Sequence, residues 1–125
     1  MQYPNCTLTF SVTLDICTPV GISDISQISD YQLSASSFYD TGNQASYGRL
    51  NGNRGDGWCA KEAKGNDDWL QVDLGKTVQV CAVATQGALN GNEWTTVFKL
   101  SYSFDGNTWT TYKDSNNTGV VRFSS

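Results

Sequence analysis

The sequence predicts an all-β domain, a sandwich or a jelly roll, from three observations. Short runs of alternating apolar and polar residues recur along the 125 residues, and turn-forming residues, among them 12 glycines, separate these runs. No stretch shows the apolar spacing of a helix longer than one or two turns. The chain length predicts one domain, since domains usually contain about 100–150 residues.

The first strand is expected over residues 7–16, where apolar residues from Leu8 to Ile16 alternate with threonine, serine and aspartate. The second covers residues 69–74, with Leu70 and Val72 on one face and Gln71 on the other. Further strands are expected at 98–102, 109–112 and 120–123, and at 78–84, where the period of two places Val78, Val80, Ala82 and Ala84 on one face. Residues 40–68 are rich in glycine, asparagine and aspartate, which is typical of loops.

A tight turn is expected between the strands at 98–102 and 109–112. Asp105 and Gly106 stand there, and this dipeptide is favoured in the type I′ turn, in which both central residues have positive φ. The two strands should therefore form a hairpin.

Composition excludes several functions. The chain contains no histidine, which excludes Ser-His-Asp and Cys-His catalytic sites. A net charge of −4 argues against a nucleic-acid partner. A glycosidase or lyase that uses carboxylates alone is the enzyme alternative, but no two acids stand in a recognisable arrangement, so we expect no enzymatic activity.

The cysteines and the sequons indicate an extracellular protein. The four cysteines lack the paired spacing of a zinc or redox motif, and an even number of widely spaced cysteines suits disulfides in an oxidising compartment. Asn5 and Asn116 begin glycosylation sequons. Cys6 and Cys17 flank the strand at 7–16, whose extended length of about 35 Å would prevent their pairing. No signal peptide is recognisable, so Met1 is interpreted as an expression start or a fragment boundary.

Several motifs in a fixed order resemble the discoidin family of F5/8 type C domains. The run Trp-Leu-Gln-Val-Asp-Leu-Gly begins at Trp69, and Val-Ala-Thr-Gln-Gly begins at Val83. Earlier and later landmarks are Cys17–Gly21, Ser34–Ser37, Arg49–Asn51, Gly57–Cys59, Lys99–Ser103 and Trp109. The resemblance implies a galactose-binding-like jelly-roll β-sandwich over residues 17–125, with residues 1–16 as an N-terminal extension.

The resemblance also implies structural roles for several landmarks. Trp58, Trp69 and Trp109 are expected in the core or at the edge of the sandwich. Arg49 and Asp73 are expected to form a buried or half-buried ion pair. Cys59 and Cys81 flank the strand at 69–74 and are expected to pair, with two buried free thiols as the alternative.

This chain departs from the family pattern at two places. Family members continue for roughly 30 residues beyond the point that corresponds to Ser125. The alternatives are a C-terminally truncated domain, or a sheet whose open edge the strand at 7–16 fills in part. The family often has arginine after Gln-Gly, but here Ala88 follows, which weakens any expectation of collagen recognition.

The resemblance also implies where a ligand binds. In the family, the ligand surface consists of loops at one end of the sandwich, and by position these are residues 38–47, 51–57 and 88–95 here. Aromatic rings beside amides and carboxylates suit a sugar or a protein surface. The candidate residues of the first and third loops are Phe38, Tyr39, Asp40, Asn43, Tyr47, Asn90, Asn92, Glu93 and Trp94. We therefore expect an extracellular adhesion module, one domain of a larger protein, that binds a cell-surface or matrix glycan or protein.

The sequence leaves alternatives to this function open, and it bears on a bound metal as well. An anionic phospholipid surface would need apolar side chains such as Leu89 above basic ones, for which Arg49, Arg54 and Lys61 are the candidates. A structural matrix domain would bind nothing specific. Calcium could occupy an aspartate-rich loop as in some relatives, although no EF-hand spacing exists, so we expect no metal and no cofactor.

The tripeptide Arg54-Gly55-Asp56 lies in the second loop. In an exposed turn, such a tripeptide is the integrin-recognition motif, because the aspartate completes a metal coordination sphere on the partner. The same residues also suit a turn that precedes the Trp58-Cys59 pair. The sequence therefore leaves integrin binding and a purely local role as alternatives.

Overall fold

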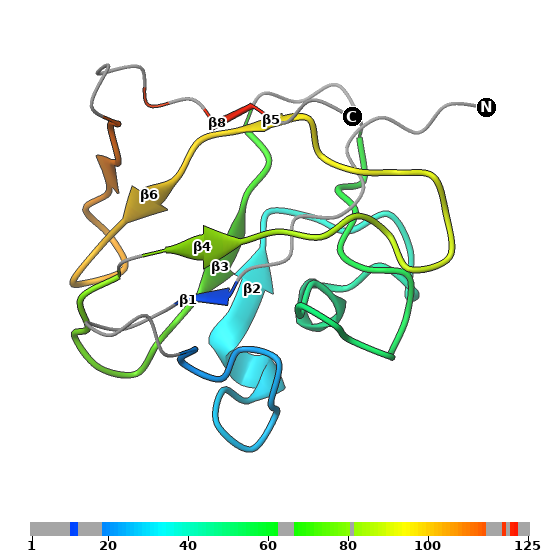
Figure 1. The fold of residues 1–125 in the computed structure, drawn as a ribbon, viewed down its shortest axis with the longest axis horizontal. Helices are drawn as coiled ribbons and strands as arrows, with labels where there is room; N and C mark the ends of the chain where they lie inside the picture. The colour runs from blue at the N-terminus through cyan, green and yellow to red at the C-terminus, as the bar shows by residue number, and fades with distance from the viewer. Residues whose placement is uncertain are drawn as a thin grey trace. The chain divides into compact units, whose positions relative to one another are not determined.

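The computed structural model describes residues 11–12, 19–62, 67–80, 82–114, 119 and 121–122. The chain divides into two compact units, Met1–Trp94 and Thr95–Ser125, and each is described by itself. In both units the strands are short and pair two by two in antiparallel fashion (Figure 1). This architecture confirms the all-β prediction.

The first unit contains two strand pairs. Strand β1 (Ser11–Val12) pairs with β4 (Val83–Ala84), and β2 (Leu33–Ala35) pairs with β3 (Leu70–Val72). The β1–β4 pair places the start of the chain against a strand more than 70 positions later, in keeping with the expectation that the strand at 7–16 joins a sheet. The rest of that predicted strand lies outside the described residues.

The β2–β3 pair begins directly after a short 3-10 helix, η1 (Asp30–Gln32). The Gln32 side-chain oxygen accepts a hydrogen bond from the Ser29 backbone N–H (3.0 Å), the reciprocal half of a capping box. The Asp73 N–H donates to the Gln32 carbonyl (2.8 Å), and the Ser36 N–H donates to the Trp69 carbonyl (3.0 Å). These bonds extend the ladder at both ends, so η1 is fixed to the sheet.

The second unit contains the late hairpin. Strand β6 (Ser101–Tyr102) pairs with β7 (Thr110–Thr111), and β5 (Val97–Phe98) pairs with β8 (Val121–Arg122). The expected strands at 109–112 and 120–123 are therefore confirmed in their central residues. The strand expected at 98–102 is divided into β5 and β6.

The expected type I′ turn is wrong. Because Tyr102 pairs with Thr110, the connection between the two strands is longer than a two-residue turn. A type I′ turn also needs positive φ at both central residues. Gly106 has φ +74°, but Asp105 does not have a positive φ, since Asn51 is the only non-glycine among the described residues that does. The reason is the Asp105 carboxylate, whose Oδ1 accepts hydrogen bonds from the N–H groups of Asn107 and Thr108 (both 2.8 Å). These bonds stabilise a wider loop than the dipeptide alone predicts.

The strand expected at 78–84 is also mostly wrong. Among the described residues of this segment only β4 is a strand, and Val83 is half-buried while Ala84 is exposed, the reverse of the predicted faces. Side chains alternate with a period of two, so an error of one position exchanges the faces. The pairing with β1 sets which residues of β4 face inward. The local alternation of valine and alanine carries no information about that partner strand.

The core of the first unit lies around Trp58. Its indole N–H donates to the Ser37 carbonyl (2.8 Å), which satisfies the polar group of a buried ring. The other buried apolar residues are Ile22, Ile28, Leu33, Cys59 and Ala60. A core position is therefore confirmed for Trp58. Trp69 and Trp109 are 47% and 45% exposed, which excludes the core for them, and the expected alternative at the edge of the sandwich stays a prediction.

The helices of the described residues are two short 3-10 segments, η1 and η2 (Ala45–Tyr47). Neither is long or apolar enough to cross a membrane, and the described part of the chain holds no other candidate. Some predicted features lie outside the described residues, namely the sequons at Asn5 and Asn116 and the cysteines Cys6, Cys17 and Cys81.

Candidate functional site

The three predicted ligand loops meet within the first unit. The Asp56 N–H donates to the Gly42 carbonyl (3.1 Å), and the Asn43 side-chain amide donates to the Gly57 carbonyl (3.1 Å). The Asn90 side-chain amide donates to Asp56 Oδ1 (2.9 Å). The first bonds join loops 38–47 and 51–57, and the last joins 51–57 to the loop that follows β4. The middle loop is therefore the common neighbour of the other two.

Glycine makes this close approach possible. Gly55 has φ +64°, and a Cβ at this position would overlap the Tyr47 ring and the Gly42 carbonyl. Since L-residues rarely adopt this conformation and no space exists for a side chain, the position admits only glycine without strain.

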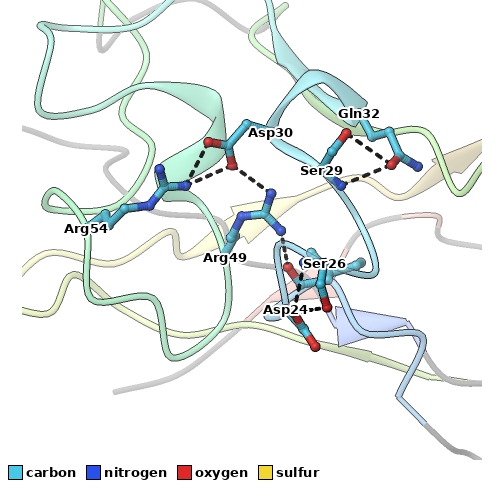
Figure 2. A network of polar contacts seen from close by, with 8 residues as sticks. Asp24, Ser26, Ser29, Asp30, Gln32, Arg49 and Arg54 are labelled. Atoms are coloured by element: carbon cyan, nitrogen blue, oxygen red, sulfur yellow. Dashed lines mark hydrogen bonds and ion pairs between the residues drawn. The ribbon is translucent and has the colours of Figure 1, made fainter.

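A carboxylate outside the loops anchors the middle loop. Asp30, at the start of η1, accepts hydrogen bonds from two arginines (Figure 2). Arg49 Nη2 lies 2.8 Å from Asp30 Oδ1, and Arg54 Nη2 lies 2.8 Å from the same oxygen and 2.9 Å from Oδ2. One carboxylate thus neutralises part of the charge of two guanidinium groups.

The expected Arg49–Asp73 ion pair is wrong. Arg49 is buried, pairs with Asp30 and donates from Nη1 to the Ile22 carbonyl. Its Nε is buried without an acceptor among the described residues. Asp73 is exposed, and its Oδ1 accepts a hydrogen bond from the Gly75 N–H (2.8 Å), which closes the turn after β3. The sequence correctly suggested a paired arginine but not its partner.

The arginines also set the ionisation of Asp30. Partial burial raises the pKa of this carboxyl, but the hydrogen bonds from Arg49 and Arg54 outweigh it, so the pKa lies below its usual value. Asp30 consequently remains charged across the physiological range. The neighbouring Asp24 also has a lowered pKa, because the Ser26 hydroxyl and N–H donate to its carboxylate.

Both charged residues of the Arg54-Gly55-Asp56 tripeptide are engaged within the chain. The Arg54 guanidinium lies over the Tyr47 ring, 5.5 Å from its centroid, in addition to its contacts with Asp30. Asp56 accepts the bond from Asn90. The tripeptide therefore resembles a clamp between loops more than a pair of charges directed at solvent.

Apolar side chains on the loops are exposed. Phe38 and Tyr39 are each 47% exposed in the first loop, and Leu89 and Trp94 are 56% and 45% exposed in the third. The Ala88 N–H donates to the Glu93 carbonyl (2.8 Å), which closes the base of the third loop. The loops thus present aromatic rings beside the amides of Asn90 and Asn92.

The space between the loops is small. A shallow hollow of about 10 Å³ is large enough for one group the size of a water molecule. Its wall consists of Tyr47, Arg49, Gly52, Gly55, Gly57, Gln86, Gly87 and Leu89. A ligand of these loops would accordingly contact their outer surface rather than enter a deep cavity.

Comparison with known proteins decides the family. The sequence pattern of the F5/8 type C domain matches residues 32–124, most of the chain. The chain belongs to the F5/8 type C domain family. Members of this family are extracellular binding modules, and this chain is one of them. No solved structure gives a significant match.

Lactadherins are among the similar curated proteins. Lactadherin of Bos taurus is 35% identical over 122 residues, which cover 87% of this chain and 28% of the relative. Lactadherin of Sus scrofa is also 35% identical, over 87% of this chain and 29% of the relative. That of Mus musculus is 35% identical over 94% and 28%. The chain therefore spans less than a third of the length of these relatives.

Two residues of this F5/8 type C domain were missed from the sequence. Asp30 was assigned no role, and Gln86 was named only as part of the Val-Ala-Thr-Gln-Gly motif, yet its Oε1 accepts a hydrogen bond from the Asn51 N–H (2.8 Å). Arg54, for which no acidic partner was predicted from the sequence, could have directed attention to Asp30. No local pattern marks Gln86, because its partner is 35 positions away.

The remaining predicted sites are a disulfide, an aspartate of the first loop and a possible metal site. Cys59 forms a disulfide, whereas Cys81 lies outside the described residues, so the Cys59–Cys81 pair stays a prediction. Asp40 accepts a hydrogen bond from the Gly42 N–H (2.7 Å) within its own loop. Among the described residues no group of three or more aspartate, glutamate or cysteine side chains could hold a metal ion.

Proposed function

We propose that this F5/8 type C domain recognises a carbohydrate or a protein at an extracellular surface through loops 38–47, 51–57 and 88–94, and that it performs no chemistry. One observation carries the proposal. Phe38, Leu89 and Trp94 remain exposed on loops that long-range hydrogen bonds hold together. Such a site has apolar faces and fixed amides without the cost of ordering loose loops.

A sugar suits this surface in two ways. Its CH face can stack on Trp94 or Phe38, and its hydroxyls can pair with the amides of Asn90 and Asn92. The shallow hollow also favours a ligand that lies across the loops, such as a glycan terminus or a protein patch.

Anionic phospholipid is the less favoured ligand, because two of its three basic candidates are engaged. Arg49 is buried against Asp30, and Arg54 shares the same carboxylate. Lys61 is exposed. Since headgroup binding draws on exposed basic side chains, vesicles with 30% phosphatidylserine (on the order of a strongly anionic leaflet) should retain little more protein than neutral vesicles.

A glycan array with matched tryptophan variants tests the proposal. Trp94→Ala should abolish binding, while Trp69→Ala, which removes an equally exposed ring outside the loops, should leave it intact. Equal loss in both variants would refute the loops as the site. An array on which the wild-type chain binds nothing would refute a carbohydrate ligand and direct the search to protein partners.

A further inference from the structure

The strongest unexplained feature of the first unit is the set of side-chain contacts that surrounds Arg54-Gly55-Asp56. Each residue of the tripeptide has a partner on a different segment. Arg54 contacts Asp30 of η1 and Tyr47 of η2, and Asp56 contacts Asn90 of the third loop. The partners are separated along the chain by up to 60 positions, so the tripeptide connects segments that local structure does not.

We infer that Arg54-Gly55-Asp56 is an internal strut that sets the arrangement of the three ligand loops, with Asp30 as its anchor, and is not itself a recognition motif. The inference deepens the proposed function, because it assigns positioning residues to that same site. Asp30 itself lies outside the three loops and acts on them through Arg54.

The geometry of the two ends supports a strut. At one end Arg54 donates to both carboxylate oxygens of Asp30, at 2.8 and 2.9 Å, a contact that fixes direction as well as distance. At the other end Asn90 Nδ2 lies 2.9 Å from Asp56 Oδ1. Gly55 between them lies against the Tyr47 ring and the Gly42 carbonyl, so the backbone of the strut packs against the first loop with no space for a side chain at this position.

The charge pattern argues against display of the tripeptide. An adhesion receptor that coordinates the aspartate through a metal needs a carboxylate free to leave the surface. Here the carboxylate is bonded to Asn90, and the guanidinium is bonded to Asp30. Binding by a receptor would have to break both contacts first.

Hydrogen exchange of the full chain, followed by mass spectrometry, tests the strut. Arg54→Ala and Asp56→Ala should each raise the exchange rate of the backbone amides about tenfold in residues 51–57. The same increase is expected in residues 89–94, which are distant in sequence and are joined to the tripeptide by the Asp56–Asn90 hydrogen bond. Asp56→Asn keeps an oxygen acceptor for Asn90 and should retain the protection. Asp24→Ala is the control in the same unit, because among the described residues its carboxylate accepts hydrogen bonds only from Ser26, two positions later.

The outcomes are separable from those of the proposed function. Faster exchange confined to residues 51–57, or equal exchange in Asp56→Asn and Asp56→Ala, would overturn the strut. So would attachment of cells to the immobilised chain that Asp56→Asn abolishes while exchange stays protected, because only a recognition motif needs the charge. If the wild-type chain binds nothing on the glycan array, the proposed ligand fails, whereas the exchange results still decide the strut. Where the array does show binding, Arg54→Ala should weaken it about tenfold.

Discussion

Two turns of this chain, each with a glycine beside an aspartate, are stabilised in different ways. The turn Arg54-Gly55-Asp56 is bonded to Asp30, Gly42 and Asn90, all distant in sequence. The turn at Asp105-Gly106 is bonded within itself, through the Ser103 hydroxyl and the N–H groups of Asn107 and Thr108. Similar residue types therefore serve a tertiary role in the first unit and a local role in the second.

The difference shows which turn belongs to a site. A turn that closes on itself can be replaced with little effect elsewhere, whereas a turn that joins three segments transmits any change to all of them. The position of the proposed ligand loops thus depends on residues that a motif search would assign to a partner protein.

The largest expected effect follows from removal of the shared anchor. Asp30→Ala leaves the buried Arg49 without its counter-ion and frees Arg54, so the free energy of unfolding should fall by about 3–4 kcal/mol. Urea denaturation measures the change. Asp105→Ala, which removes a carboxylate with local bonds only, should cost much less, and equal losses would remove the distinction between the two turns.

The glycines of the two turns should differ in the same direction. Gly55→Ala must adopt positive φ and also displace the Tyr47 ring or the Gly42 carbonyl, which should cost about 2–3 kcal/mol in the free energy of unfolding. Chemical denaturation, compared with the wild-type chain, provides the value. A cost below that of Gly106→Ala would contradict the close packing of the first turn.

Gly106→Ala should have the smaller effect. Gly106 has φ +74°, but a Cβ there would meet no atom within 4 Å, so only the backbone conformation opposes the substitution. The expected cost is about 1 kcal/mol. Gly106→Asn should recover part of it, because asparagine tolerates the left-handed region better than alanine.

The smallest effect is a local response of the second turn to acid. Hydrogen bonds from the Thr108 and Asn107 N–H groups and the Ser103 hydroxyl lower the pKa of Asp105 from 3.8 to about 2. Because the folded value lies below the ordinary one, the stabilisation is complete above pH 3.8 and is lost as the pH falls through about 2. NMR shifts of the two amides should titrate with that midpoint, and a midpoint near 3.8 would show that the bonds do not form.

Much of the fold could be predicted from local patterns. The period-two alternation of apolar and polar residues located β3 and the hairpin of β6 and β7. Burial itself does not alternate there, since the residues of β3 are all half-buried and those of β6 and β7 are all exposed. The same patterns failed at β4, where the faces depend on the partner strand β1. They also failed at Asp105, whose side chain competes with the backbone preference of the dipeptide.

The candidate site divides in the same way. The loops that meet, and their exposed aromatic residues, were found from the order of motifs along the chain. The partner of Arg49 was not found, because ion pairing depends on which carboxylate the folded backbone brings within about 3 Å of the guanidinium. The sequence alone does not distinguish Asp30 from Asp73 in this respect.

The sequence by itself determined the β class, the family, the absence of histidine chemistry and the segments that are proposed as ligand loops. These depend on residue type and on short-range periodicity, which no folding step can alter. Only the tertiary structure decided that Asp30 holds two arginines, that Asp56 is bonded to Asn90, and that Trp58 alone of the three landmark tryptophans named above is buried. Those outcomes depend on distances between residues remote in the chain, which are fixed when the strands pair and the loops meet.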